Sequence, residues 1–235
     1  MINNLQYSTL SGKAILIVNT GSIKKKFILQ RLKKLGLTIV MLHKEKNWAQ
    51  SYVDYWILAD TANHIESLRA IDAFIKTNRQ VKIDGSLTFW EDDVLLTSKI
   101  TDKFNWIGIP YDVAKQARNK FLFREFCQSN GIQSPKHKLI RSTNDVDDSL
   151  SFPLVIKPAY GSSSAYVVKV ENKEEFLDTY NYVKKNMSSN IESALSDGMD
   201  ILVEEYIDGD EVDIDILLQN GKVKFYSISD NYQTE

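Results

Sequence analysis

Residues 152–164, FPLVIKPAYGSSS, join an apolar, strand-like run to a lysine, a proline, and then a glycine with three serines. Because Lys157 ends an apolar run, we expect its ammonium group to be partly desolvated, where it interacts strongly with an anion. Residues 161–164 supply backbone N–H groups and hydroxyls with little side-chain bulk, which suits a loop that covers phosphate groups. The stretch is not a Walker A loop, since G-x-x-x-x-G-K-[ST] is missing and the lysine precedes the glycine. Taken alone, it fits a flexible turn after a strand equally well.

A second distinctive stretch, VEEYIDGDEVDID at residues 203–215, places acidic residues directly after an apolar strand. The alternation of side chains along a strand puts Glu211, Asp213 and Asp215 on one face. One interpretation is a solvated edge. The other is a nucleotide clamp, in which backbone groups after Glu204 meet an adenine edge and a carboxylate accepts hydrogen bonds from ribose hydroxyls.

The chain before this region alternates strand-like and helical runs from residue 13 to about 110. Such alternation predicts a parallel sheet covered by helices, and therefore a Rossmann-like α/β domain. The first strand is followed by NTGSIKKK, which lacks the G-x-G-x-x-G spacing of a dinucleotide site. We expect no NAD or FAD there.

The pattern changes after Pro110. We expect Asp112 to cap one helix that runs to Gly131, and this helix carries Lys120 and Arg124 on one face. A solvated basic stripe is the plainest interpretation of that pair. The segments that follow predict a hairpin of 153–158 with 165–170, a helix after an Asn172–Glu175 capping box, a strand at 201–207, and a final hairpin with Asn220-Gly221 at its tip.

Composition restricts the function classes. The 235-residue chain has a net charge of −2, so nothing indicates a nucleic-acid or membrane-surface partner. Its single cysteine, Cys127, excludes an intrachain disulfide, and no secretory signal is evident, so a cytoplasmic location is expected. No apolar run approaches the ~20 residues that span a bilayer. The three histidines are too far apart in sequence to suggest a zinc site.

The residues singled out above resemble a known family. Lys120, VIKPAYGSSS and VEEYIDGDEVDID recur in the order and spacing of the ATP-grasp superfamily, and DGSLTFWEDDVLLTSKITDKF is similar to its carnosine-synthase-type carboxylate–amine ligases. The resemblance implies an α/β chain in two parts. Residues 1–111 would form the Rossmann-like pre-ATP-grasp domain, and 112–235 an incomplete ATP-grasp domain, with its N-terminal lobe at about 136–204 and then the start of its C-terminal lobe.

The resemblance also implies roles for particular residues. Two lysines would hold the nucleotide's phosphates, a mobile loop would cover the γ-phosphate, a hinge would lie beside the adenine, and an acid would bind the ribose. These positions are, in that order, Lys120 and Lys157; Gly161, Ser162, Ser163 and Ser164; Glu204, Glu205, Tyr206 and Ile207; and Glu211. For Asp84, Glu91 and Asp92 we expect only capping and turn roles around the helix after TFW.

The activity implied is a ligation that uses ATP and Mg²⁺. The carboxylate of an amino acid would be converted to an acyl phosphate, and an amine would then attack this acyl phosphate. The partners would be small carboxylate and amine molecules, with neither nucleic acid nor membrane, and a homodimer is open because the superfamily often dimerises. In the family, the magnesium ligands and a catalytic arginine lie further along the chain. We therefore expect an N-terminal piece of a longer enzyme that is inactive alone, with no metal site of its own and with catalytic residues beyond Glu235.

Three alternatives remain open. A carboxylase-type or purine-pathway ATP-grasp ligase would use the same nucleotide site on another acid. A nucleotide-binding or scaffolding protein would use it without catalysis. In the third alternative the α/β domain binds something unrelated and Lys157 is structural.

Overall fold

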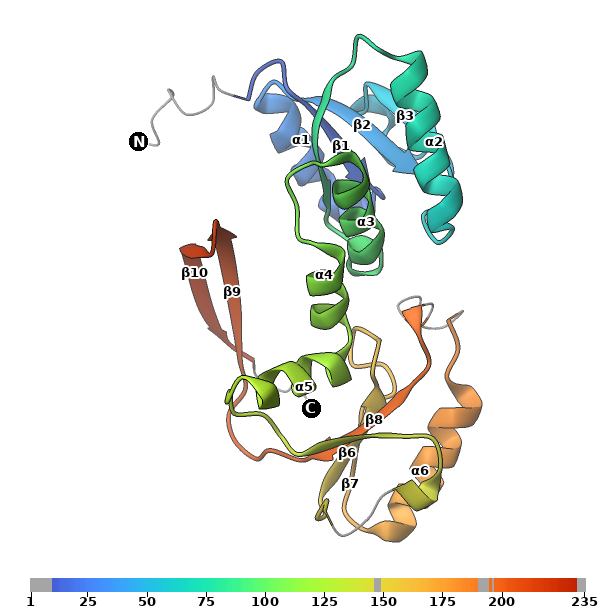
Figure 1. Cartoon of the computed structure of the whole chain (residues 1–235), viewed down its shortest axis with the longest axis vertical. Helices are drawn as coiled ribbons and strands as arrows, with labels where there is room; N and C mark the ends of the chain where they lie inside the picture. Colours follow the sequence, from blue (N-terminus) through green and yellow to red (C-terminus); the bar gives the residue numbers. More distant parts are fainter. Residues whose placement is uncertain (1–9, 146–148, 190–194, 196, 232–235) are drawn as a thin grey trace.

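The computed structural model describes residues 10–145, 149–189, 195 and 197–231. Along the chain these residues form a first sheet, two short helices, a second sheet and a separate hairpin (Figure 1). The first sheet is parallel, with the order β3-β2-β1-β4. Its strands are β1 (Ala14–Val18), β2 (Thr38–His43), β3 (Tyr55–Leu58) and β4 (Ile83–Thr88). The predicted Rossmann-like sheet is confirmed.

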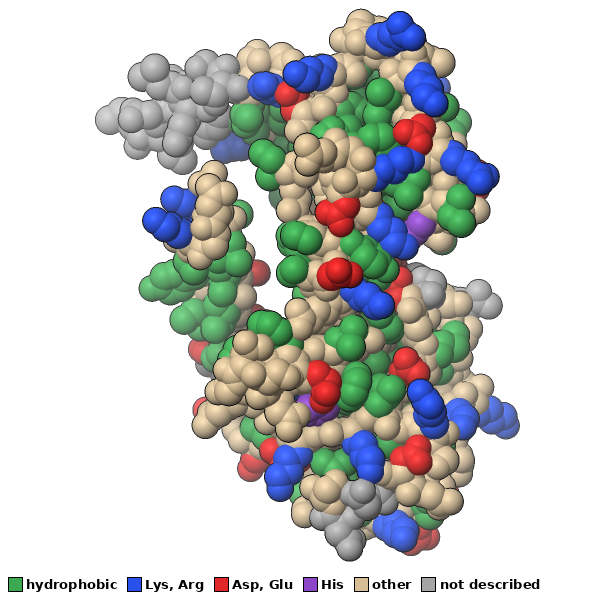
Figure 2. All heavy atoms as spheres, viewed as in Figure 1, with side chains coloured by type: hydrophobic (Ala, Val, Ile, Leu, Met, Phe, Trp, Pro, Cys, Tyr) green, Lys and Arg blue, Asp and Glu red, His purple; other side chains and the backbone are tan. Residues whose placement is uncertain are grey.

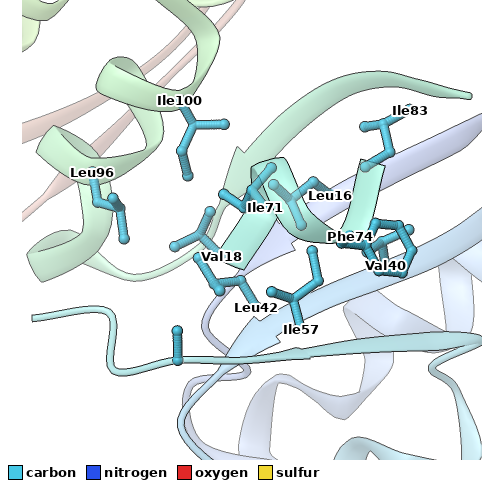
Figure 3. Packing of buried hydrophobic residues seen from close by; sticks show 11 residues of the cluster. Leu16, Val18, Val40, Leu42, Ile57, Ile71, Phe74, Ile83, Leu96 and Ile100 are labelled. Carbon is cyan, nitrogen blue, oxygen red and sulfur yellow. The ribbon is translucent and has the colours of Figure 1, made fainter. Parts of the chain in front are cut away.

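Helices cover both faces of this sheet because its strands are apolar on both sides. On one face, Leu16 and Val18 of β1 pack against Ile71 and Leu96 (Figure 3). On the other face, Ile17 belongs to a cluster with Leu29. The first face is covered by α2 (His64–Thr77) and α3 (Val94–Phe104), and the second by α1 (Lys26–Lys34). Short 3₁₀ turns are η2 (Ile23–Lys25), η3 (Trp48–Ser51), η4 (Glu91–Asp93) and η5 (Thr143–Asp145).

The predicted single helix after Pro110 is wrong. The segment forms two helices, α4 (Tyr111–Arg118) and α5 (Lys120–Ser129), because Asn119 adopts an extended conformation between them. Asn119 is the N-cap of α5, and its side chain accepts a hydrogen bond from the Leu122 N–H at 3.0 Å. Asp112 lies in the first turn of α4 and does not cap it. The break starts a new helix at Lys120; the domain boundary at 111/112 stays a prediction.

The second sheet is antiparallel, with the order β5-β8-β6-β7. Phe176 and Tyr180 of α6 pack on one face, against Leu154 and Ile156. The capping box of this helix is confirmed, since Asn172 accepts from the Glu175 N–H at 3.1 Å. The opposite face of the second sheet is covered by α5. The elements are β5 (His137–Ile140), β6 (Leu154–Pro158), β7 (Val168–Val170), β8 (Ile201–Glu205) and α6 (Lys173–Asn186).

The final hairpin, β9 (Val212–Gln219) and β10 (Lys222–Asp230), is also confirmed. Asn220 and Gly221 have φ values of 51° and 70°, as a two-residue hairpin turn requires. The hairpin stands apart from both sheets, and hydrophobic side chains are visible on it (Figures 1 and 2). Its apolar residues are all at least 49% exposed: Val212, Ile214, Ile216, Leu217, Leu218, Val223, Phe225, Tyr226 and Ile228.

No helix within the described ranges combines the length and apolarity needed to cross a membrane.

Candidate active site: a lysine pair and an interdomain cavity

Lys157 of β6 and Glu204 of β8 form an ion pair on the face of the second sheet that α5 covers. The register pairs Val155 with Glu204, so Lys157, two residues along β6, is the diagonal neighbour of Glu204 on the same face. Arg124 of α5 donates from Nε to the second carboxylate oxygen of Glu204 at 3.1 Å. The solvated basic stripe expected on α5 is therefore wrong for Arg124, whose side chain is only 23% exposed.

The charges of this cluster perturb one another. Burial by itself would raise the pKa of Glu204, but the hydrogen bond from Arg124 and the charge of Lys157 outweigh it and lower that pKa. The pKa of the Lys120 ammonium is also lowered, first by burial and then by the like charges of Lys157 and Arg118. Lys120 and Lys157 are therefore near enough to repel each other, which makes the space between them attractive to an anion.

Lys120 ties the start of α5 to the small-residue loop. Its backbone N–H donates to the Ala159 carbonyl at 2.8 Å, and its Nζ donates to the Gly161 carbonyl at 2.9 Å. The loop has left-handed backbone at several positions, with φ of 141° at Gly161, 52° at Ser163 and 56° at Ser164. Ser163 and Ser164 are exposed, and Ser162 is half-buried. The predicted phosphate loop thus starts at the Lys120 ammonium and projects toward solvent.

The predicted hinge, residues 204–207, comprises the last two residues of β8 and the two residues after it. The Glu205 N–H donates to the Lys136 carbonyl at 2.9 Å, and the Tyr206 N–H to the Pro153 carbonyl at 3.1 Å. Ile207 is 63% exposed. Tyr206, Ile207 and Glu211 share a hollow of about 530 Å³ at the foot of the hairpin. The structure thus places the predicted residues in two groups: the lysines with Glu204 and the loop, and the hinge with Glu211.

The acidic residues expected to serve in caps and turns behave differently. Asp84 lies within β4, where it accepts from the Ala14 N–H at 3.0 Å and pairs with Lys13 at 3.0 Å, so the capping role predicted for it is wrong. Asp92 accepts from the Trp90 indole N–H at 3.1 Å, which is a local turn contact. Glu91 lies in η4 and forms a salt bridge with Arg118 at 2.7 Å.

A large cavity, about 1070 Å³, lies between the first sheet and the second, and the sequence motifs give no indication of it. The strand order reverses between β1 and β4, and ligands of open α/β sheets bind at the carboxyl ends of such strands. Asn19 follows β1 and Trp90 follows β4, and both line the cavity together with Tyr160 from the second part of the chain. None of the predicted nucleotide-binding residues lines it.

The wall of this cavity includes polar groups that sequence patterns do not reveal. Asp93 is 3% exposed and accepts from Asn19 Nδ2 at 2.7 Å, and burial raises its pKa. Lys99 lies 3.0 Å from the His64 Nδ1 and 4.9 Å from the centre of the Tyr111 ring. Each of these contacts joins residues from different elements of the chain, so no local sequence pattern predicts it. The positions of Asn19 and Trp90 after strands were the only sequence signal for a site here.

The chain is similar in sequence to a known domain family and to curated proteins. Residues 150–235 match the family described as the ATP-grasp domain. The chain is 24% identical over 245 residues to carnosine synthase 1 of Mus musculus, an alignment that covers 96% of this chain and 29% of that protein.

Solved structures of ligases have a similar fold. The L-amino acid ligase from Bacillus licheniformis superposes with a TM-score of 0.74 at 21% identity, over 95% of this chain and 52% of that one. The N5-carboxyaminoimidazole synthetase from Staphylococcus aureus, complexed with ADP, superposes with a TM-score of 0.72 at 16% identity, over 95% of this chain and 56% of that one. The chain therefore spans about half the length of these structures and less than a third of the carnosine synthase. The chain has the fold of these ligase structures, and its residues 150–235 match the ATP-grasp domain family.

Proposed function

We propose that this chain provides the nucleotide-binding part of an ATP-dependent ligase that joins the carboxylate of an amino acid to an amine. One observation carries the proposal: Lys120 and Lys157 converge on one face of the second sheet beside the loop that begins at Gly161. A phosphate-binding role explains why the Lys120 ammonium group is held near the like charge of Lys157, although burial disfavours the charged form of Lys120.

The residues present fit a polyphosphate. The lowered pKa of Lys120 reflects burial and the neighbouring charge of Lys157, and an anion between the two ammonium groups would offset that repulsion. Residues 161–164 offer backbone N–H groups and hydroxyls at the same place. The ADP complex of a ligase with this fold supports a nucleotide as the anion.

The hollow at the foot of the hairpin would receive the nucleoside. Tyr206 and Ile207 would border the adenine, and the Glu211 carboxylate would accept hydrogen bonds from the ribose hydroxyls. The N–H groups of Glu205 and Tyr206 already donate to the Lys136 and Pro153 carbonyls, so hydrogen bonds from these two residues to the base would have to use their carbonyls.

No group of three metal-ligating side chains lies within the residues that the structure describes. Magnesium would arrive with ATP, because Mg²⁺ binds polyphosphate oxygens with few protein ligands.

When bound, ATP supplies the γ-phosphoryl group, which the substrate carboxylate attacks to give an acyl phosphate and ADP. An amine then attacks the acyl carbon, an amide bond forms, and phosphate leaves. Lys120 and Lys157 would neutralise the charge that phosphoryl transfer spreads over the oxygens. Closure of the loop at 161–164 would exclude water from the acyl phosphate.

The wider assignments belong to the proposal as well. Small carboxylate and amine substrates, a cytoplasmic location and a homodimer remain predictions. The carboxylase-type or purine-pathway ligase is an alternative that shares the nucleotide site, and the fold likeness does not separate it from the amino-acid ligase.

The test is calorimetric titration with Mg-ATP of the wild type and of Lys157→Met, which keeps the aliphatic stem and leaves Glu204 paired with Arg124. Lys138→Met is the matched control, because Lys138 lies on β5 of the same sheet and pairs with Val203, which faces α6. Loss of a charge-assisted contact to phosphate predicts an affinity about tenfold to a hundredfold lower in Lys157→Met.

Equal ATP affinity in the wild type and Lys157→Met would overturn the role of Lys157. No ATP binding by a folded wild type would overturn the proposed function of this chain. Binding of ATP that depends on Lys157, with no ligation of any amino-acid pair by the longest form of the protein, would favour the non-catalytic alternative.

A further inference from the structure

Arg118, the last residue of α4, is a buried cation that the proposed nucleotide site does not use. Its side chain is 5% exposed, and it lies two residues before Lys120. Its Nη1 donates to a carboxylate oxygen of Glu91 in η4 at 2.7 Å. Its Nη2 lies 3.5 Å from the Oδ2 of Asp197, a residue between α6 and β8. The guanidinium group therefore joins the part of the chain that forms the first sheet to the segment that leads into β8.

Ala159 links this segment, residues 197–200, to the nucleotide lysine through the backbone. The Ala159 N–H donates to the Asp200 carbonyl at 2.8 Å, and the Ala159 carbonyl accepts from the Lys120 N–H at 2.8 Å. Because Arg118 and Lys120 are two residues apart, these contacts and the Arg118 ion pair close a ring that runs through residues 197–200. Each contact in such a network limits the motion of the others, so the ring restrains the Lys120 backbone more than one hydrogen bond would.

The same segment packs on the start of the phosphate loop. Gly198 lies against the Tyr160 ring, since a Cβ atom added to Gly198 would be 2.8 Å from the ring atom Cδ2. Tyr160 is 6% exposed and precedes Gly161, whose carbonyl accepts from the Lys120 Nζ at 2.9 Å. A shift of residues 197–200 would therefore displace the Tyr160 ring and the loop that follows it.

The charges around Arg118 do not all favour an anion. Burial is the largest cause of the lowered pKa of Lys120, the charges of Lys157 and Arg118 lower it further, and the charge of Glu91 raises it. Burial raises the pKa of Asp197, and the charge of Arg118 opposes that rise. Carboxylates at a phosphate site oppose the binding of phosphate by charge alone. Their role here must therefore be structural, and holding Arg118 supplies one.

We propose that Arg118 is a positioning residue for the nucleotide site. Through Asp197 it fixes residues 197–200, and with them the base of the phosphate loop and the backbone of Lys120. Through Glu91 it makes ATP affinity depend on the part of the chain that forms the first sheet. The inference rests on the proposed function, because it concerns the same lysine and loop. Arg118 acts through these groups and contacts no phosphate in this assignment.

Calorimetric titration of the full 235-residue chain with Mg-ATP tests the proposal. Arg118→Met and Asp197→Asn should each bind ATP about tenfold less tightly or worse, because the loop and Lys120 lose their fixed geometry. The direction of the Asp197→Asn effect is decisive, since removing a negative charge would by itself strengthen the binding of an anion.

Each variant has a matched control. Asp178→Asn also removes an acid, and Asp178 is an exposed residue of α6. Lys115→Met also removes a cation from α4, and Lys115 is an exposed residue one turn before Arg118. Neither control should change ATP affinity.

Glu91→Gln tests the link to the first sheet. Glu91 is 57% exposed, so we expect a smaller loss of ATP affinity, about threefold. In the Arg118→Met background, Glu91→Gln should have no further effect, because its partner is already gone.

A second readout needs no nucleotide. The amide hydrogens of Lys120 and Ala159 belong to the ring of contacts, so they should exchange faster in Asp197→Asn than in the wild type. Hydrogen exchange followed by NMR measures both.

Weaker ATP binding by a folded Asp197→Asn, with unchanged binding by Asp178→Asn, supports the assignment. Unchanged or tighter ATP binding by Asp197→Asn overturns it, as does unchanged exchange of the two amides. ATP binding that depends on Lys157, but on neither Arg118 nor Asp197, overturns this inference and leaves the proposed function standing. No ATP binding by a folded wild type overturns both. Where Arg118→Met fails to fold, Asp197→Asn decides alone.

Discussion

Lys157 and Glu204 lie on adjacent antiparallel strands, share one face of the second sheet, and form an ion pair that Arg124 completes from α5. Glu204 is 5% exposed, so its carboxylate cannot be hydrated as it would be at the surface. Its two oxygens each accept from a different cation. This arrangement fixes the side chain of Lys157, the lysine that we propose to contact the nucleotide.

Glu204→Gln should lower the free energy of unfolding by about 2 kcal/mol, because it leaves two partly buried cations without their counter-charge. Urea denaturation at neutral pH measures the change. Glu205→Gln is the control, since Glu205 is the next residue but forms no salt bridge within the described residues. A neutral effect of Glu204→Gln would show that the ion pair adds no stability.

The same pair predicts a pH dependence. The folded-state pKa of Glu204 lies below its ordinary value of 4.5, so its stabilising effect is present above pH 4.5 and is lost as the pH falls through 4.5 and below. The stability difference between the wild type and Glu204→Gln should shrink over that acid range. A difference that stays constant with pH would contradict the lowered pKa.

Asn119→Ala should destabilise the chain by about 1 kcal/mol, because it removes the side-chain cap of α5. Asn119→Asp keeps an oxygen acceptor for the Leu122 N–H, so it should restore most of the loss. Since Lys120 is the first residue of α5, Asn119→Ala should also weaken ATP binding, and Asn119→Asp should not. Urea denaturation and calorimetry give the two readouts.

Gly161→Ala should weaken ATP binding, because φ at Gly161 is 141°, a conformation that a residue with a Cβ atom adopts only with strain. The strain would move the carbonyl that Lys120 contacts. Gly131→Ala is the matched control, with φ of 67° after α5 and no atom within 4 Å of the added Cβ. Both substitutions should cost stability of about 1 kcal/mol, and only Gly161→Ala should reduce ATP affinity.

The β9–β10 hairpin should exchange its amide hydrogens much faster than the first sheet does. Its nine apolar side chains are exposed, and an isolated two-stranded hairpin is marginally stable in water. Hydrogen-exchange mass spectrometry should find protection in β1 and β2, which are buried on both faces, and little in residues 212–230. Strong protection there would indicate that the hairpin is covered in solution, by a second copy in the simplest case.

Much of the fold could be predicted from short-range pattern. The parallel sheet, the Asn172–Glu175 capping box and the Asn220-Gly221 turn are confirmed where the structure describes them. Each depends on residues a few positions apart, because periodicity, caps and tight turns are local.

The candidate site could be predicted only in part. The lysines and the small-residue loop stand out as a motif, and the structure brings them together. The role of Arg124 was missed, because an i, i+4 basic pair on a helix is usually solvated, and here the helix packs on a sheet that carries a buried acid. The helix break at Asn119 was missed because the segment keeps helical spacing on both sides of it.

The sequence by itself determined the alternation of strands and helices in the first sheet, the Asn172–Glu175 capping box, the Asn220-Gly221 turn, and the residue types that suit a polyphosphate. Only the tertiary structure decided which charges meet. Glu204 lies 47 residues from Lys157 and 80 from Arg124, and Lys99 lies 35 from His64. Such pairs form when separate elements pack, and the burial that packing imposes is what shifts their pKa values and makes them a site.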